Sequence, residues 1–173
     1  MKIIKTKKFI LRPLKMSDKK ALVENVNNKK ITDRLLVVPY PYTLKDAEKW
    51  IRRCQRNLRK KVKNNIVFGI EINGKVVGSI GIHDIAKEHK ATIGYWLGEK
   101  YWGSGIMSEV IKIISNFCFK ELKLKRVEAG VFLFNPASKR VLEKNGFKLE
   151  GIIKKGEKKG NKFIDIFLMA KVK

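Results

Sequence analysis

A two-residue turn between two alternating apolar runs limits the folds open to this chain more than any other sequence feature. The runs cover residues 66–72 and 75–82, and Asn73-Gly74 joins them. Asn-Gly is the strongest short hairpin signal, because both turn residues need a positive φ that Asn and Gly tolerate. The middle of the chain is therefore expected to contain antiparallel strands, and an all-helical fold is excluded.

The other periodic segments predict an α+β fold with a mixed, mostly antiparallel sheet. Seven strands are expected, over residues 9–11, 66–72, 75–82, 91–97, 126–133, 147–153 and 162–172. Four helices are expected, from Ser17 to about Asn28, from Thr43 through Lys63, across Met107–Cys118, and over Pro136–Lys144. Thr43 and Asp46 resemble a capping box at the start of the second helix. No repeat or composition break divides the chain, so residues 1–173 are expected to form a single domain.

Positive charge is concentrated in the first part of the chain. The formal net charge is +24, and residues 1–65 hold 20 basic and 5 acidic side chains. Four of the basic residues share a face of the expected helix after Thr43: Arg52, Arg56, Arg59 and Lys63. This face predicts docking on a ribosome, another RNA or an acidic protein surface. The alternatives are an ordinary solvated helix face, or a lysine-rich composition that reflects growth temperature or an AT-rich genome.

Several classes of protein are disfavoured. No apolar run approaches the ~20 residues that span a bilayer, and the first residues have no apolar stretch of signal-peptide length, so a cytoplasmic protein without membrane contact is expected. Cys54 and Cys118 lie far apart in apolar helical patterns and are expected to be buried free thiols. His83 and His89 have no spacing typical of a metal site, so no metal is expected.

A glycine-containing loop is the first candidate for chemistry. Trp102-Gly103-Ser104-Gly105-Ile106-Met107 connects the strand over 91–97 to the next helix. Such a loop lets main-chain N–H groups converge at a helix N-terminus, where an anion such as a diphosphate is favoured, although Gly-x-Gly also occurs as a plain turn. Ser108 stands where a dinucleotide fingerprint has its third glycine, and no Gly-Lys-Ser/Thr follows, so NAD and ATP are disfavoured.

Two sequence blocks carry a resemblance to a known family. The stretch GYWLGEKYWGSGIMSEVI is followed about 25 residues later by NPASKRVLEKNGFKLEG. Together they resemble the Gcn5-related N-acetyltransferase (GNAT) superfamily, and within it the RimJ/RimL branch of ribosomal-protein N-terminal acetyltransferases. The resemblance covers essentially the whole chain and implies a single GNAT domain and an acetyl-CoA-dependent N-acetyltransferase. Met107 departs from the small residue that the superfamily has at this place.

The resemblance also implies which residues hold acetyl-CoA. The main chain of Tyr95, Trp96 and Leu97 would hold the pantetheine, and the loop amides would hold the diphosphate. The expected cofactor-binding residues are Tyr95, Trp96, Leu97, Trp102, Gly103, Ser104, Gly105, Ile106, Met107, Asn135, Ser138 and Lys139. Asn135 would reach the pantetheine arm, and Lys139 or Lys144 the 3′-phosphate. The alternative for both lysines is an ordinary solvated surface position. The residues alone predict Asn135 as a helix N-cap before Pro136, and both roles can hold.

Two residues are expected to carry the catalysis by the same resemblance. Ser138 matches the serine proposed to protonate the departing thiolate in RimL-like enzymes, and Glu157 falls where their general base lies. An exposed turn carboxylate among lysines is the alternative for Glu157. His83, Asp84 and Glu99 are reserve bases that would act through water.

The leading hypothesis is acetyl transfer from acetyl-CoA to the N-terminal α-amino group of a ribosomal or other protein, by direct attack in a ternary complex. A polyamine or another small amine is the alternative acceptor, which the net charge of +24 disfavours because it repels polycations. A non-catalytic nucleic-acid-binding module is the alternative from another class. A monomer or a homodimer is expected.

Overall fold

The computed structural model describes residues 3–173, which divide into two compact units. The first unit holds residues 3–83 and 95–106, and the second holds residues 84–94 and 107–173. The single domain expected over residues 1–173 stays a prediction.

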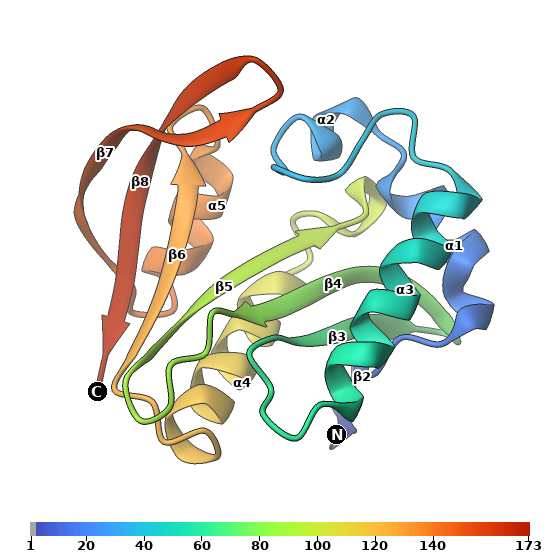
Figure 1. The fold of residues 1–173 in the computed structure, drawn as a ribbon, viewed down its shortest axis with the longest axis horizontal. Helices are drawn as coiled ribbons and strands as arrows, with labels where there is room; N and C mark the ends of the chain where they lie inside the picture. The colour runs from blue at the N-terminus through green and yellow to red at the C-terminus, as the bar shows by residue number, and fades with distance from the viewer. Residues whose placement is uncertain (1–2) are drawn as a thin grey trace. The chain divides into compact units, whose positions relative to one another are not determined.

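Four antiparallel strands form the framework of the first unit (Figure 1). They are β1 (Ile4–Lys5), β2 (Ile10–Arg12), β3 (Ile66–Ile72) and β4 (Lys75–His83). Leu11 lies opposite Ile70, and Ile66 lies opposite Ile82. Asn73 has φ 49° and Gly74 φ 77°, so both turn residues have the positive φ of a tight hairpin turn. The hairpin predicted from Asn73-Gly74 is confirmed.

The helices of the first unit end earlier than the sequence pattern predicts. They are η1 (Met16–Asp18), α1 (Lys19–Val26), α2 (Lys29–Thr32) and α3 (Leu44–Arg59). The capping box of Thr43 and Asp46 is present. However, α3 ends before Lys63, which is exposed beyond it, so its placement on the helix face was wrong. Basic side chains at 59, 60, 61 and 63 would repel one another in a continued helix.

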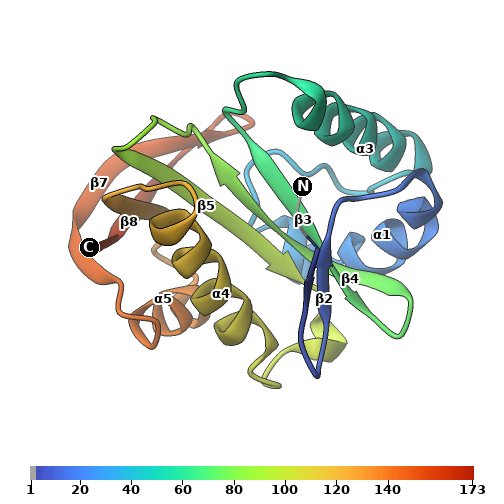
Figure 2. The same cartoon turned by 90° about the horizontal axis from the view of Figure 1, so that it is seen from below.

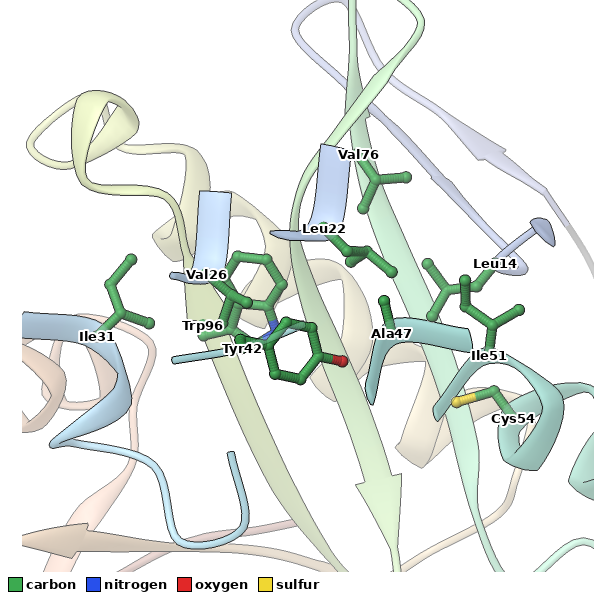
Figure 3. Close-up of a cluster of buried hydrophobic side chains, with 10 residues drawn as sticks. All are labelled: Leu14, Leu22, Val26, Ile31, Tyr42, Ala47, Ile51, Cys54, Val76 and Trp96. Carbon is green, nitrogen blue, oxygen red and sulfur yellow. The ribbon is translucent and has the colours of Figure 1, made fainter. Parts of the chain in front are cut away.

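A buried apolar cluster holds α1 and α3 on the strands of the first unit. The helices lie side by side, with α1 against β4 and α3 against β3 (Figures 1 and 2). Figure 3 shows the side chains that meet there: Leu14, Leu22, Val26, Ile31, Tyr42, Ala47, Ile51, Cys54, Val76 and Trp96. Burial from water raises the pKa of the Cys54 thiol to about 11. Cys54 and Cys118 are both buried and free, as predicted.

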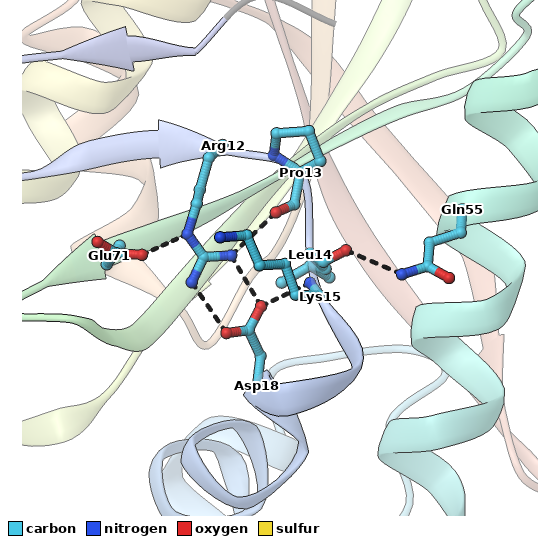
Figure 4. A network of polar contacts seen from close by, with 7 residues as sticks. All are labelled: Arg12, Pro13, Leu14, Lys15, Asp18, Gln55 and Glu71. Atoms are coloured by element: carbon cyan, nitrogen blue, oxygen red, sulfur yellow. Dashed lines mark hydrogen bonds and ion pairs between the residues drawn. The ribbon is translucent and has the colours of Figure 1, made fainter.

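A buried ion network joins the strands of the first unit to the helices that follow them (Figure 4). Arg12 donates two hydrogen bonds to the carboxylate of Asp18, at 2.8 and 2.9 Å, and one to Glu71. The main-chain N–H of Lys15 also donates to Asp18, at 2.7 Å. The Asp18 side chain is only 6% exposed. A bidentate arginine that is also bound to a second carboxylate fixes the turn between β2 and α1.

The second unit is built from three long strands and two helices. The strands are β6 (Arg126–Phe132), β7 (Lys148–Lys159) and β8 (Lys162–Val172), and the helices are α4 (Ile106–Lys120) and α5 (Pro136–Glu143). β8 lies between β6 and β7 and is antiparallel to both. α5 packs against β8. β6 ends at Phe132, one residue before its predicted end, and Leu133 beyond it is exposed.

β5 (Lys90–Leu97) contributes to both units. Its first residues pair in parallel with β6, from Lys90 opposite Arg126 to Thr92 opposite Glu128. The hydrogen-bonded order is β1-β2-β3-β4-β5-β6-β8-β7, which makes eight strands among the described residues. Seven strands were predicted, and the strand that was missed is β1. It has two residues and is too short to show a sequence period. No helix within residues 3–173 is long and apolar enough to cross a membrane.

Candidate functional site

The end of β5 lies very close to β4 within the first unit. A Cβ atom on Gly78 would lie 2.6 Å from the carbonyl oxygen of Trp96 and 3.1 Å from the Cα of Leu97. The N–H of Gly98 donates to the carbonyl of Val77 at 2.8 Å. Glycine at residue 78 thus lets the two backbones approach, and it fixes the strand end that carries the predicted residues Tyr95, Trp96 and Leu97. Tyr95 is half-buried, and Trp96 and Leu97 are buried.

The loop after β5 is tied to the strand that precedes it. Beyond η2 (Glu99–Tyr101), the indole N–H of Trp102 donates to the carbonyl of Leu97 at 2.7 Å. The hydroxyl of Ser104 donates to the carbonyl of Tyr101 at 2.6 Å. The Trp102 side chain is nevertheless 45% exposed. The two bonds close the loop on itself and leave the surface of residues 102–105 open to solvent.

Both glycines of the loop have a conformation that other residues rarely adopt. Gly103 has φ 75° and Gly105 has φ 77°, and a Cβ on either would meet no atom within 4 Å. Glycine is therefore needed here for its backbone angles, since space is available for a side chain. Ile106, which follows directly, is the first residue of α4. Exposed main-chain N–H groups at the start of a 15-residue helix suit an anion.

The second unit anchors the start of α4 to the end of α5. The side-chain amide of Asn145 donates to the hydroxyl of Ser108 at 3.0 Å and to the carbonyl of Val141 at 2.8 Å. The ammonium group of Lys171 on β8 donates to the carbonyl of Asn145 at 2.8 Å. Met107 is buried next to Ser108. Ser108, which stands in place of the third glycine of a dinucleotide fingerprint, is thus hydrogen-bonded to Asn145 of the second sequence block.

Asn135 caps α5, as the residues alone predict. Its side-chain oxygen accepts from the main-chain N–H of Ser138 at 3.3 Å, and Pro136 is the first helical residue. Ser138 is half-buried in the first turn. Lys139 is engaged by its own unit, because its ammonium lies 3.2 Å from the carboxylate of Glu143 and 5.3 Å from the ring centre of Phe167. The ligand-binding roles of these residues stay predictions.

Glu157 lies in a strand, so its alternative placement in an exposed turn was wrong. It is half-buried in β7, opposite Ile164 of β8. The register of the two strands shifts between Ile153 and Glu157, and the carboxylate of Asp165 accepts from the N–H of Lys155 at 2.7 Å within this bulge. The extra residues of the bulge lengthen β7 beyond its predicted end.

Two of the three reserve bases are held by neighbours in the first unit. The Glu99 carboxylate accepts from Lys30 and Asn28, and these hydrogen bonds lower its pKa, which weakens it as a base. The His83 ring lies 3.1 Å from the Asn65 side-chain oxygen, measured from Nδ1. It also fills the space above Gly81, where a Cβ would lie 2.2 Å from its Nε2. Asp84 is exposed with φ 51° and belongs to the second unit.

The predicted site residues therefore fall into two groups that are described separately. The first unit carries Tyr95, Trp96, Leu97, Trp102, Gly103, Ser104, Gly105 and Ile106, and the second carries Met107, Asn135, Ser138, Lys139 and Glu157. A strand that ends in a closed glycine loop at the N-terminus of a helix is an arrangement that suits a phosphate-bearing ligand.

Comparison with known proteins identifies the family. The Acetyltransferase (GNAT) domain model matches residues 8–148, and the chain belongs to this family. YjcK, a probable N-acetyltransferase of Bacillus subtilis strain 168, is 32% identical over 161 residues, which cover 90% of this chain and 89% of YjcK. The resemblance predicted from the two sequence blocks is confirmed. The protein is an N-acetyltransferase that uses acetyl-CoA as acyl donor.

Relatives that act on ribosomal proteins are among the matches. The ribosomal-protein-serine acetyltransferase of Escherichia coli K12 is 30% identical over 130 residues, which cover 69% of this chain and 73% of that protein. The structure of RimL, a ribosomal L7/L12 α-N-protein acetyltransferase in complex with coenzyme A, matches with a TM-score of 0.87 and 24% identity. That match covers 99% of this chain and 98% of the RimL chain and shows a shared fold.

Sequence reasoning missed the contacts that hold the site in shape. The bond from Trp102 to Leu97 and the bond from Asn145 to Ser108 were not predicted. The first had a usable signal, because a tryptophan in an exposed loop needs a partner for its indole N–H. The second joins residues that are 37 positions apart and had no local signal.

Proposed function

We propose that the enzyme transfers the acetyl group of acetyl-CoA to the N-terminal α-amino group of a ribosomal protein, by direct attack in a ternary complex. The proposed acceptor rests on the 30% identity to a ribosomal-protein-serine acetyltransferase over 69% of this chain. An α-amino group, with a pKa of ~7.7–8.0, is neutral often enough at pH 7 to attack with mild assistance, whereas a lysine amine, with a pKa of ~10.4, is not.

The glycine loop is proposed to hold the diphosphate of acetyl-CoA. The positive φ at Gly103 and Gly105 turns the main chain so that it leads directly into α4. Converging N–H groups and the helix dipole attract the diphosphate without any lysine or arginine side chain. Trp102 keeps this loop closed through its bond to Leu97. The main chain of Tyr95, Trp96 and Leu97 is proposed to hold the pantetheine and to polarise the thioester carbonyl.

Ser138 and Glu157 are proposed to handle the two protons of the reaction. The amine nitrogen forms a bond to the acetyl carbon while the carbon–sulfur bond breaks. Glu157, half-buried in β7, accepts the proton that the nitrogen loses. The Ser138 hydroxyl donates a proton to the departing sulfur and recovers one from solvent. Asn135 is proposed to position Ser138 through its cap and to contact the pantetheine arm.

One labelling experiment tests the acceptor. The protein is incubated with acetyl-CoA labelled in the acetyl group and with a ribosomal-protein extract, and the labelled peptides are mapped by mass spectrometry. We expect label on the N-terminal α-amine of one or a few proteins. A parallel incubation with spermidine tests the small-amine alternative. Label confined to lysine side chains or to spermidine would overturn the proposed acceptor and leave the acetyltransferase assignment intact.

A further inference from the structure

An uninterrupted basic segment runs along α3 and the residues that follow it. No acidic residue occurs between Glu48 and Glu71 in the sequence. Eight basic side chains of this segment are exposed, and one of them, Arg52, is paired with Glu48. The other seven are named here the α3 basic surface: Lys49, Arg53, Arg56, Arg59, Lys60, Lys61 and Lys63. Figure 2 shows α3 along one side of its unit, with the strands on the other side of the helix. Among the described residues, none of these seven has a carboxylate within ion-pair distance.

The acidic residues that flank this segment are each bound elsewhere. The Asp46 carboxylate accepts from the main-chain N–H and the hydroxyl of Thr43 at the start of α3. Glu48 is paired with Lys19 at 3.0 Å and with Arg52 at 2.8 Å, and Glu71 is bound to Arg12. Arg52, which the sequence grouped with Arg56 and Arg59, is therefore neutralised within the helix. Asp46 interacts electrostatically with Lys49 at the start of the surface. Among the described residues, no ion pair reaches the basic side chains from Arg53 to Lys63, so their positive field is compensated little.

The residues of this surface suit phosphate groups. Lys49, Arg53 and Arg56 are spaced by four and three residues, so they form one stripe along α3, about 10 Å long at ~1.5 Å per residue. Lys60 follows directly after the last helical residue. A guanidinium group binds phosphate with two parallel hydrogen bonds, and Arg53, Arg56 and Arg59 are all exposed.

The composition of the surface favours a nucleic acid over an acidic protein. A stable protein interface needs an apolar centre, whereas nucleic-acid interfaces are polar and strongly positive. Among residues 49–63, Val62 is the one large apolar side chain that is exposed. We propose that the α3 basic surface docks the enzyme on the phosphate backbone of RNA. The choice of RNA rests on the proposed ribosomal-protein acceptor.

Salt dependence of RNA binding tests this proposal without acetyl-CoA, so its outcome is separate from that of the acceptor experiment. The probe is a fluorescent 20-nucleotide single-stranded RNA, and affinity is measured between about 50 and 200 mM salt. The surface variant is R53Q, R56Q, R59Q and K60Q. Each lost phosphate contact lowers the salt slope by ~0.7, so four contacts lower it by ~2.8. Raising the salt from about 50 to 200 mM is therefore expected to weaken RNA binding ~50-fold more in the wild type than in the variant.

A variant of equal net charge is the matched control. K112Q, K120Q, K123N and K125Q remove four exposed charges from α4 and the loop after it in the second unit. Equal effects of the two variants on the salt slope would overturn the proposal, because only net charge would then matter. Tighter binding of polyglutamate than of RNA, with the same sensitivity to the surface variant, would overturn it in favour of an acidic protein. Acetylation of a short neutral peptide is expected to be the same in both variants within about twofold.

Discussion

The side-chain oxygen of Asn135 accepts a hydrogen bond from the main-chain N–H of Ser138 at 3.3 Å. The bond involves no atom of the Ser138 side chain, so the helix cap and the serine hydroxyl can be removed independently. This separation makes the proposed catalytic role of Ser138 testable without disturbing α5.

Replacing Ser138 with alanine is expected to lower turnover and to leave acetyl-CoA binding intact. Loss of a general acid costs ~10²–10⁴-fold in kcat, and the main-chain cap from Asn135 remains. Steady-state kinetics and calorimetric titration with acetyl-CoA measure the two effects. As a comparison, N135A is expected to cost ~1 kcal/mol of stability through the lost cap, and N135D to retain most of it. Unchanged kcat in S138A would remove the serine from the mechanism.

Replacing Gly105 is expected to weaken acetyl-CoA binding according to how well the new residue tolerates positive φ. Because a Cβ at Gly105 would meet nothing within 4 Å, the cost comes from the φ of 77°. A β-branched residue in this region costs more than ~1–2 kcal/mol, whereas asparagine adopts it readily. We expect G105V to lose at least tenfold in affinity and G105N to lose less. Equal affinity of G105V and wild type in a thermal-shift titration would contradict the proposed diphosphate site.

Replacing Arg12 with methionine is expected to destabilise the protein by ~3–5 kcal/mol, because the buried carboxylate of Asp18 loses its bidentate partner. R52M is the matched control, since it breaks the solvent-exposed pair with Glu48 and is expected to cost under ~0.5 kcal/mol. Urea unfolding at pH 7 measures both values. A similar small loss in the two variants would show that the Arg12 network contributes little to stability.

The stability of the second unit is expected to fall as the pH drops below about 4.3. Burial raises the pKa of Glu128, but hydrogen bonds from Arg126 and Lys90 outweigh it and hold the pKa below its ordinary value. A lowered pKa in the folded state adds stability above the unfolded pKa of ~4.3, and this stability is lost as the pH falls through the folded pKa.

Urea unfolding of E128Q between pH 7 and pH 3 isolates this contribution. The variant should be less stable than wild type at pH 7 and should lose less stability on acidification. E121Q, which changes an exposed glutamate, serves as the control. The same pH dependence in E128Q and wild type would assign the acid sensitivity to other carboxylates.

The sequence predicted those parts of the fold and site that depend on neighbouring residues. The Asn73-Gly74 hairpin and the Asn135 cap with Pro136 follow from local backbone preferences, and both are present. The Arg12 network could not be predicted, because Arg12 and Glu71 lie 59 positions apart and meet only when β2 pairs with β3.

The predictions failed where tertiary contacts override a local pattern. Glu157 was considered as a turn residue among lysines, yet the bulge that receives Asp165 extends β7 past it. Lys63 was grouped with Arg52, Arg56 and Arg59 on one helix face, but α3 ends at Arg59, before it. Each error lies where charge repulsion or a neighbouring strand decides the backbone, and a 3.6-residue or 2-residue period carries no information about either.

The imidazole of His83 occupies the volume that a side chain at residue 81 would need. Residues 81 and 83 point to the same side of β4, because they are two positions apart in a strand. The residue types that positions 81 and 83 can hold therefore depend on each other. A lineage that gains a side chain at position 81 must first give up the ring at position 83 or move it aside, so the two positions should vary together among relatives that share this strand.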